Sequence, residues 1–205
     1  MARRRDPEAQ KARRAAAEAS DVLEAAARSL SGAPRSRKSL EERLITAGYP
    51  EEHVRSAVAR LVEIGLIDDE RFGLALLDSR DRSRQRGDRA LLQELKRRGI
   101  DEELAQRLLA QRAAGESLGA EPVWGATLRI VEEQAGGAEG AEERAARAAL
   151  AKMRLRGGDA RAEVQRLAQG LARRGFPSGL SWRLARERVE AEAQTTLAEG
   201  DTEAE

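Results

Sequence analysis

Residues 91–109, LLQELKRRGIDEELAQRLL, combine a helical pattern, a glycine break and a second helical pattern, and the chain repeats this arrangement twice. The other copies are LEERLITAGYPEEHVRSAVARL at 40–61 and VQRLAQGLARRGFPSGLSWRLARERV at 164–189. Repetition of this kind is typical of tandem modules that bury their apolar faces against one another. The 205-residue chain is therefore predicted to be a series of related helical units.

The breaks in the three copies fall at Gly48, Gly99 and Gly175. In each copy a leucine stands four residues before the glycine and an apolar residue follows the glycine directly. These pairs are Leu44 and Tyr49, Leu95 and Ile100, and Leu171 and Phe176. The pattern predicts that each glycine adopts the left-handed conformation that ends a helix, while the next residue packs back against it. Proline or aspartate then begins the second helix, at Pro50, Asp101 and Pro177.

Each copy needs a third helix to cover its apolar stripe, and an apolar segment upstream of each copy can supply one. The expected fold is all-α, with three tandem three-helix modules forming an elongated, curved helical-repeat body. We expect a charged N-terminal arm (1–18) that is a frayed tail, modules at 19–66, 67–113 and 140–190, a linker with room for a short helix (114–139), and a disordered acidic C-terminal tail (191–205).

The composition limits the chemistry that the chain can perform. It has no cysteine and one histidine, too few groups for a thiolate or histidine metal site or for a nucleophilic triad. We therefore expect no enzymatic activity, no metal and no cofactor. The lack of cysteine suits a reducing compartment, and no stretch is long and apolar enough for a membrane span, so a soluble cytoplasmic protein is expected.

The strongest functional feature is a basic run between Arg80 and Arg98, with eight basic and three acidic residues, although the net charge of the whole chain is only +1. The basic members are Arg80, Arg82, Arg84, Arg86, Arg89, Lys96, Arg97 and Arg98. Guanidinium groups donate paired hydrogen bonds that match phosphate or carboxylate, so the run predicts a binding surface. The alternative is a solvated helix face with internal ion pairs.

A second basic cluster lies in the third copy and contributes Lys152, Arg154, Arg156, Arg161, Arg166, Arg173 and Arg174. Few aromatic residues accompany either cluster, which disfavours stacking on single-stranded bases. Contact with phosphates or with an acidic protein groove is the expected use of both clusters.

Several conspicuous residues have structural interpretations. In GLIDDERF (65–72), Gly65 is placed to end one helix and Asp68 to cap the next, with Asp69 in its first turn and Phe72 on its apolar face. We interpret these four residues as a tight corner between modules rather than as a metal site. His53 is expected at an ordinary exposed helix position. Trp182, at helical spacing from Val189, is expected in the core.

These motifs together resemble the RecX family. The similarity lies in RSRKSLEERL followed by Gly-Tyr, in GLIDDERF with the arginine-rich helix end after it, in ELKRRGID, and in LARRGFPSGLSWRL, and it extends over residues 22–189. The resemblance implies a monomer that binds the RecA recombinase and its filament on single-stranded DNA. It further implies inhibition of recombinase, ATPase and coprotease activities, which would modulate DNA repair and recombination, together with weak direct DNA binding.

The alternative function is a helix-turn-helix regulator that acts directly on duplex DNA. Three-helix modules suit that function, but a recognition helix should begin with residues that read bases or contact phosphates. The second helices of the repeats instead begin PEE, DEE and PSG. A third alternative is a helical scaffold without any contact to nucleic acid.

Overall fold

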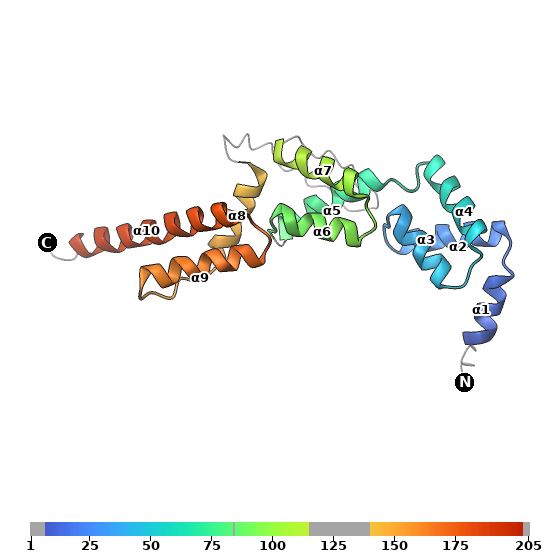
Figure 1. Cartoon of the computed structure of the whole chain (residues 1–205), viewed down its shortest axis with the longest axis horizontal. Coiled ribbons are helices and arrows are strands. Elements are labelled where there is room, and N and C mark those ends of the chain that lie inside the picture. The colour runs from blue at the N-terminus through green and yellow to red at the C-terminus, as the bar shows by residue number, and fades with distance from the viewer. Residues whose placement is uncertain (1–6, 84, 115–139, 203–205) are drawn as a thin grey trace. The chain divides into compact units, whose positions relative to one another are not determined.

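The computed structural model describes residues 7–83, 85–114 and 140–202, and within these ranges the chain forms ten helices and no strand (Figure 1). The predicted all-α class is therefore confirmed. None of these helices is long and apolar enough to cross a membrane. The helices are α1 (Pro7–Ala15), α2 (Ala19–Gly32), α3 (Arg37–Thr46), α4 (Glu51–Glu63), α5 (Asp69–Ser83), α6 (Asp88–Arg97), α7 (Glu102–Ala114), α8 (Ala141–Ala151), α9 (Ala160–Arg173) and α10 (Ser178–Thr202).

In chain order, α2–α4 are termed the first module, α5–α7 the second and α8–α10 the third. By its contacts the chain divides into two compact units, and the boundary passes through the second module. One unit contains the described residues up to Leu76 together with Leu95–Leu108. The other contains Leu77–Glu94 and the described residues from Leu109 onward.

The core of the first module is aliphatic. Helices α2 and α4 make its most extensive contact, and α3 packs against α4. The fully buried side chains include Val22 from α2, Leu40 from α3, and Val54 and Val58 from α4. Their spacing of three or four residues along each helix produces the apolar stripe that the sequence predicted.

The third module has a similar core with smaller side chains. Helices α9 and α10 pack closely, and α8 covers them with alanines such as Ala146 and Ala149. Leu167, Leu171 and Leu184 fill the centre and are almost completely buried. Because alanine lacks a long side chain, α8 can approach its partner helices closely.

The three glycine breaks adopt the predicted conformation, with φ of +97° at Gly48, +85° at Gly99 and +90° at Gly175. The amide of the next residue donates to the leucine carbonyl at the end of the preceding helix, as from Ile100 to Leu95 at 3.0 Å. The second helices begin at Glu51, Glu102 and Ser178, directly after the predicted starting residues Pro50, Asp101 and Pro177.

Residues 65–72 have the local glycine turn and helix cap that the sequence predicted. Gly65 has a φ of +72°, and Asp68 Oδ1 accepts a hydrogen bond of 2.9 Å from the amide of Arg71 at the start of α5. Asp69 makes a further contact, because its Oδ1 accepts from the amide of Arg37 at 2.7 Å and so also serves the first turn of α3. Burial raises the pKa of Asp69 above its usual value. Phe72 is half-buried.

The two ends of the described chain differ from expectation. The arm expected to be a frayed tail contains α1, and the acidic tail expected to be disordered continues α10 as far as Thr202. The arm is ordered because it contacts the first module, since the guanidinium of Arg14 donates to the carbonyl oxygen of Ala47 at 3.1 Å. The linker predicted at 114–139 lies almost entirely outside the described residues.

Candidate nucleic-acid interface

The loop between α8 and α9 forms one wall of a basic surface hollow in the third module. After α8 ends at Ala151, two consecutive glycines with positive φ, Gly157 at +74° and Gly158 at +95°, turn the chain into α9. Asp159 then caps α9 by accepting from the amides of Arg161 and Ala162 at 3.1 and 3.2 Å. The glycines allow the sharp turn, and the aspartate fixes where the helix begins.

An ion pair inside α9 holds this loop in place. Glu163, which is 8% exposed, accepts from Arg166 Nε at 3.0 Å and from the amide of Arg156 at 3.1 Å. Arg166 also donates to the carbonyl oxygen of Arg154 at 2.7 Å. The hydrogen bonds from Arg166 lower the pKa of Glu163 to about 2, so its carboxylate stays charged at neutral pH. The Glu163 carboxylate and the Arg166 guanidinium therefore hold the loop in place through contacts within the chain.

The loop and the adjoining side of α9 surround a hollow of about 750 Å³. Its lining contains five arginines and no acidic residue. The lining consists of Met153, Arg154, Leu155, Arg156, Arg166, Gly170, Arg173 and Arg174. The absence of a side chain at Gly170 helps to shape the hollow, because a methyl group at that position would lie only 2.9 Å from Met153 Cε. Without a side chain at Gly170, Met153 can seat the loop against α9.

Three arginines of the hollow, Arg154, Arg156 and Arg173, are exposed and have no acidic partner within ion-pair distance in the parts of the chain that the structure describes. Arg174 donates to the carbonyl oxygen of Gly170 at 3.1 Å and is otherwise exposed. Guanidinium groups gathered without carboxylates bind phosphate by paired, charge-assisted hydrogen bonds. The chemistry available here is anion binding.

The structure brings together five of the seven basic residues predicted for the third module. The other two are not part of the lining: Lys152 donates to Gln85 Oε1 at 2.7 Å, and Arg161 is exposed in the first turn of α9. No group of three or more metal-binding side chains occurs within the described ranges.

The basic run in the second module is arranged differently, because several of its side chains make ion pairs. Arg80 and Arg86 both bind Glu94, at 2.5 and 3.2 Å. Arg82 pairs with Asp78 one helical turn earlier, and Lys96 pairs with Glu102 at 2.7 Å. Arg89, Arg97 and Arg98 are exposed, whereas Arg84 lies outside the described residues. Much of this run thus matches the alternative interpretation of a helix face with internal ion pairs, and its role in binding stays a prediction.

The structure also reveals a charged residue that the sequence reasoning missed. Arg112 on α7 is buried, with 2% of its side chain exposed, and it binds Asp81 at 2.7 Å and Asp88 at 2.5 Å. Glu142 on α8 joins the same group, since its Oε1 accepts from the amide of Asp88 at 2.9 Å. A signal existed in the sequence: Arg112 follows Ala105, Leu108 and Leu109 at helical spacing, which places it on the apolar face of α7.

This cluster predicts a pH-dependent contribution to stability from Asp88. Burial, followed by the nearby Glu142 carboxylate, raises the pKa of Asp88 from 3.8 to about 6. The folded state then binds a proton more tightly than the unfolded state, so this contribution is fully present below pH 4 and is lost as the pH rises through 6. Because the carboxylate is partly exposed, we expect the loss to be about 1–2 kcal/mol.

Urea denaturation of the wild type and of Asp88→Asn between pH 4 and pH 7 measures this contribution. The variant keeps an oxygen for Arg112 but cannot ionise, so its free energy of unfolding should rise relative to that of the wild type as the pH increases. Parallel pH profiles for the two proteins would show that the pKa of Asp88 is not raised.

Comparisons with known proteins identify the architecture. A model of the first three-helix domain of RecX matches residues 23–61, and a model of the second three-helix domain matches residues 68–109. The regulatory protein RecX of Thermobifida fusca is 35% identical over 168 residues, which cover 80% of this chain and 77% of that protein. The chain belongs to the RecX family. The regulatory protein RecX of Streptomyces coelicolor is 33% identical, with 85% of this chain and 80% of that protein covered.

A solved RecX structure shows the same fold. The crystal structure of RecX from Lactobacillus salivarius superimposes with a TM-score of 0.64 at 18% sequence identity, covering 82% of this chain and 95% of that one. At this identity the likeness concerns the fold alone. Membership of the RecX family makes the chain a regulatory protein without enzymatic activity, as the sequence predicted.

Proposed function

We propose that this RecX-family protein binds the RecA recombinase and its filament on single-stranded DNA, and that it inhibits strand exchange, ATP hydrolysis and coprotease activity. Family membership supports the identity of the partner. The observation that carries the mode of binding is the hollow of the third module, where Arg154 and Arg173 are exposed and make no ion pair within the described residues, and where Arg156 is exposed beside Glu163.

The proposed mechanism is steric and electrostatic. Arginines of the hollow engage the phosphates of the filament, or carboxylates of a recombinase groove, by charge-assisted hydrogen bonds. The helical modules then bridge neighbouring recombinase subunits, which blocks access of partner DNA and restricts the subunit motions that hydrolysis requires. The ion-paired residues of the second module, such as Arg80 and Arg86, contribute mainly to the rigidity of that part of the chain.

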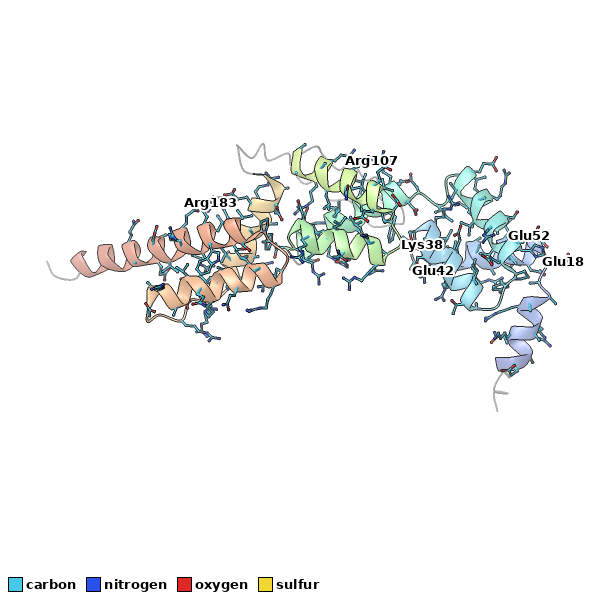
Figure 2. All side chains as sticks on the ribbon, viewed as in Figure 1. Glu18, Lys38, Glu42, Glu52, Arg107 and Arg183 are labelled. Atoms are coloured by element: carbon cyan, nitrogen blue, oxygen red, sulfur yellow. The ribbon has the colours of Figure 1, made fainter. Side chains whose placement is uncertain are left out.

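Direct regulation of duplex DNA by a helix-turn-helix is less well supported. The first residues of α4 and α7, which would approach the major groove, are Glu51, Glu52, Glu102 and Glu103, and all four are exposed (Glu52 is labelled in Figure 2). Carboxylates at these positions repel the phosphate backbone. Helices α4 and α7 therefore lack the basic first turn that binding in the major groove needs.

Measuring ATP hydrolysis by RecA on single-stranded DNA, with and without this protein, tests the proposal. We expect substoichiometric amounts of the protein to lower the rate, because one molecule that bridges subunits affects more than one of them. Unchanged hydrolysis and strand exchange would contradict the proposal. Tight binding to duplex DNA in the absence of recombinase would instead favour the helix-turn-helix alternative.

A further inference from the structure

Each glycine turn of the repeats is covered by another segment of the chain, and the turn at Gly99 shows this most clearly. There the first turn of α3, from the preceding module, lies so close that a methyl group on Gly99 would stand 2.6 Å from Ser36 Oγ and 3.1 Å from the amide nitrogen of Ser39. The hydroxyl of Ser36 donates to the carbonyl oxygen of Arg98, the residue before the glycine, at 2.5 Å. Ser36 is completely buried by this contact.

The turn at Gly175 has the same arrangement with the preceding module. A methyl group there would lie 2.8 Å from the amide nitrogen of Ala90, in the first turn of α6. The amide of Gly87, which precedes α6, donates to the carbonyl oxygen of Arg174 at 3.1 Å. Gly87 precedes Ala90 by three residues, as Ser36 precedes Ser39, so the two junctions correspond position by position.

The turn at Gly48 belongs to the first module, and it is covered as well. Here α1 supplies the contact: a methyl group on Gly48 would lie 3.1 Å from Lys11 Cγ. Arg14 Nη1 donates to the carbonyl oxygen of Ala47, again the residue before the glycine, at 3.1 Å. The guanidinium of Arg14 also lies 5.7 Å from the centre of the Tyr49 ring, a cation–π contact.

We propose that α1 is the N-terminal cap of the repeat series and substitutes for a preceding module on the turn of the first one. The same three elements occur at each turn: a glycine with positive φ, a neighbouring helix or its first turn within about 3 Å of where a Cβ would stand, and a donor to the carbonyl before the glycine. A series of stacked repeats has an uncovered face at its end, and a capping segment shields that face from other chains and from solvent. The partner of the Gly48 turn is thus the chain's own residues 7–15.

Two further contacts hold the chain just after the cap, between α1 and α2, against the module. Nδ1 of His53 on α4 lies 3.0 Å from the carbonyl oxygen of Ala17, in position to donate, and Ala17 packs against the core of the first module. The half-buried His53 therefore has a structural role at this junction, rather than the ordinary exposed position that the sequence predicted.

Amide hydrogen exchange in the full-length protein tests the cap through the variant Arg14→Ala. This change removes the donor to Ala47 and the contact with the Tyr49 ring. The amides of Gly48 and Tyr49, which donate within the turn, should then exchange about fivefold faster. Arg13→Ala is the matched control, since Arg13 is the exposed neighbour on the same helix.

The turn at Gly99 serves as an internal reference, because its amides should exchange at the wild-type rate in both variants. Faster exchange at Gly48 and Tyr49 in Arg14→Ala alone supports the cap. Equal rates at these amides in Arg14→Ala and Arg13→Ala would overturn it, and so would an equal acceleration at both turns, which would show a general loss of stability.

Discussion

Replacing Arg112 with alanine is expected to lower the free energy of unfolding by about 3–5 kcal/mol. Asp81 and Asp88 would lose the cation that neutralises them, while Glu142 would remain beside Asp88. Both carboxylates are partly buried, and a partly buried carboxylate that loses its partner costs more than the pair itself contributes to stability. Urea denaturation followed by circular dichroism measures the loss.

Arg107→Ala is the control for this prediction. Arg107 lies on the same helix and is exposed (labelled in Figure 2), so its replacement should change the free energy of unfolding by no more than about 0.5 kcal/mol. The loss caused by Arg112→Ala should also become smaller below pH 5, where Asp88, with a pKa of about 6, takes up a proton. A similar small effect for both variants at neutral pH would refute the structural role of Arg112.

Local rules account for the parts of the fold that the sequence predicted well. The turn at Gly99 needs only a glycine with positive φ and an isoleucine whose amide reaches back to Leu95, and all of these residues lie within a few positions of one another. Asp68 likewise caps α5 through the amide of Arg71, three residues away. Such features depend on the backbone nearby and therefore follow from sequence spacing alone.

The features that the sequence did not predict depend on contacts between distant residues. Arg112 and Asp81 are 31 positions apart, so their pairing requires the packing of α7 near the end of α5. Trp182 was expected in the core with Val189 but is 45% exposed, because α10 turns Ser181, Leu184 and Ala185 inward instead. For a tryptophan among alternating apolar and charged residues, spacing alone does not determine which face is buried.

The candidate site contains both features that the sequence predicted and features that depend on contacts in the folded chain. Sequence identified the basic residues of the third module, but it treated all seven as equivalent. Their separation into a hollow and its surroundings depends on Glu163, which draws Arg166 and the amide of Arg156 onto α9. Glu163 is bound to Arg166 and to the backbone of Arg156, and no ion pair within the described residues involves Arg154 or Arg173. No pattern of basic residues alone could show that.

The double variant Arg154→Ala/Arg173→Ala is expected to weaken binding to single-stranded DNA about tenfold or more, because it removes from the hollow two exposed guanidinium groups that make no ion pair with the described part of the chain. The dependence of the logarithm of affinity on the logarithm of salt concentration should become shallower by about 1.4, the value for two lost phosphate contacts on a single strand. Fluorescence anisotropy with a labelled oligonucleotide gives both quantities. Inhibition of ATP hydrolysis by RecA should require correspondingly more of the variant.

The matched control is Arg183→Ala/Arg186→Ala, which removes the same charge from the same module. Arg183 is already engaged by Glu143 at 2.8 Å and by Glu187 at 3.3 Å, and both replaced residues lie on α10, outside the hollow (Arg183 is labelled in Figure 2). Equal losses of affinity in the two variants would mean that only net charge matters and would remove the case for the hollow. Loss of inhibition with unchanged DNA affinity would make carboxylates of the recombinase, rather than phosphates, the ligand of these arginines.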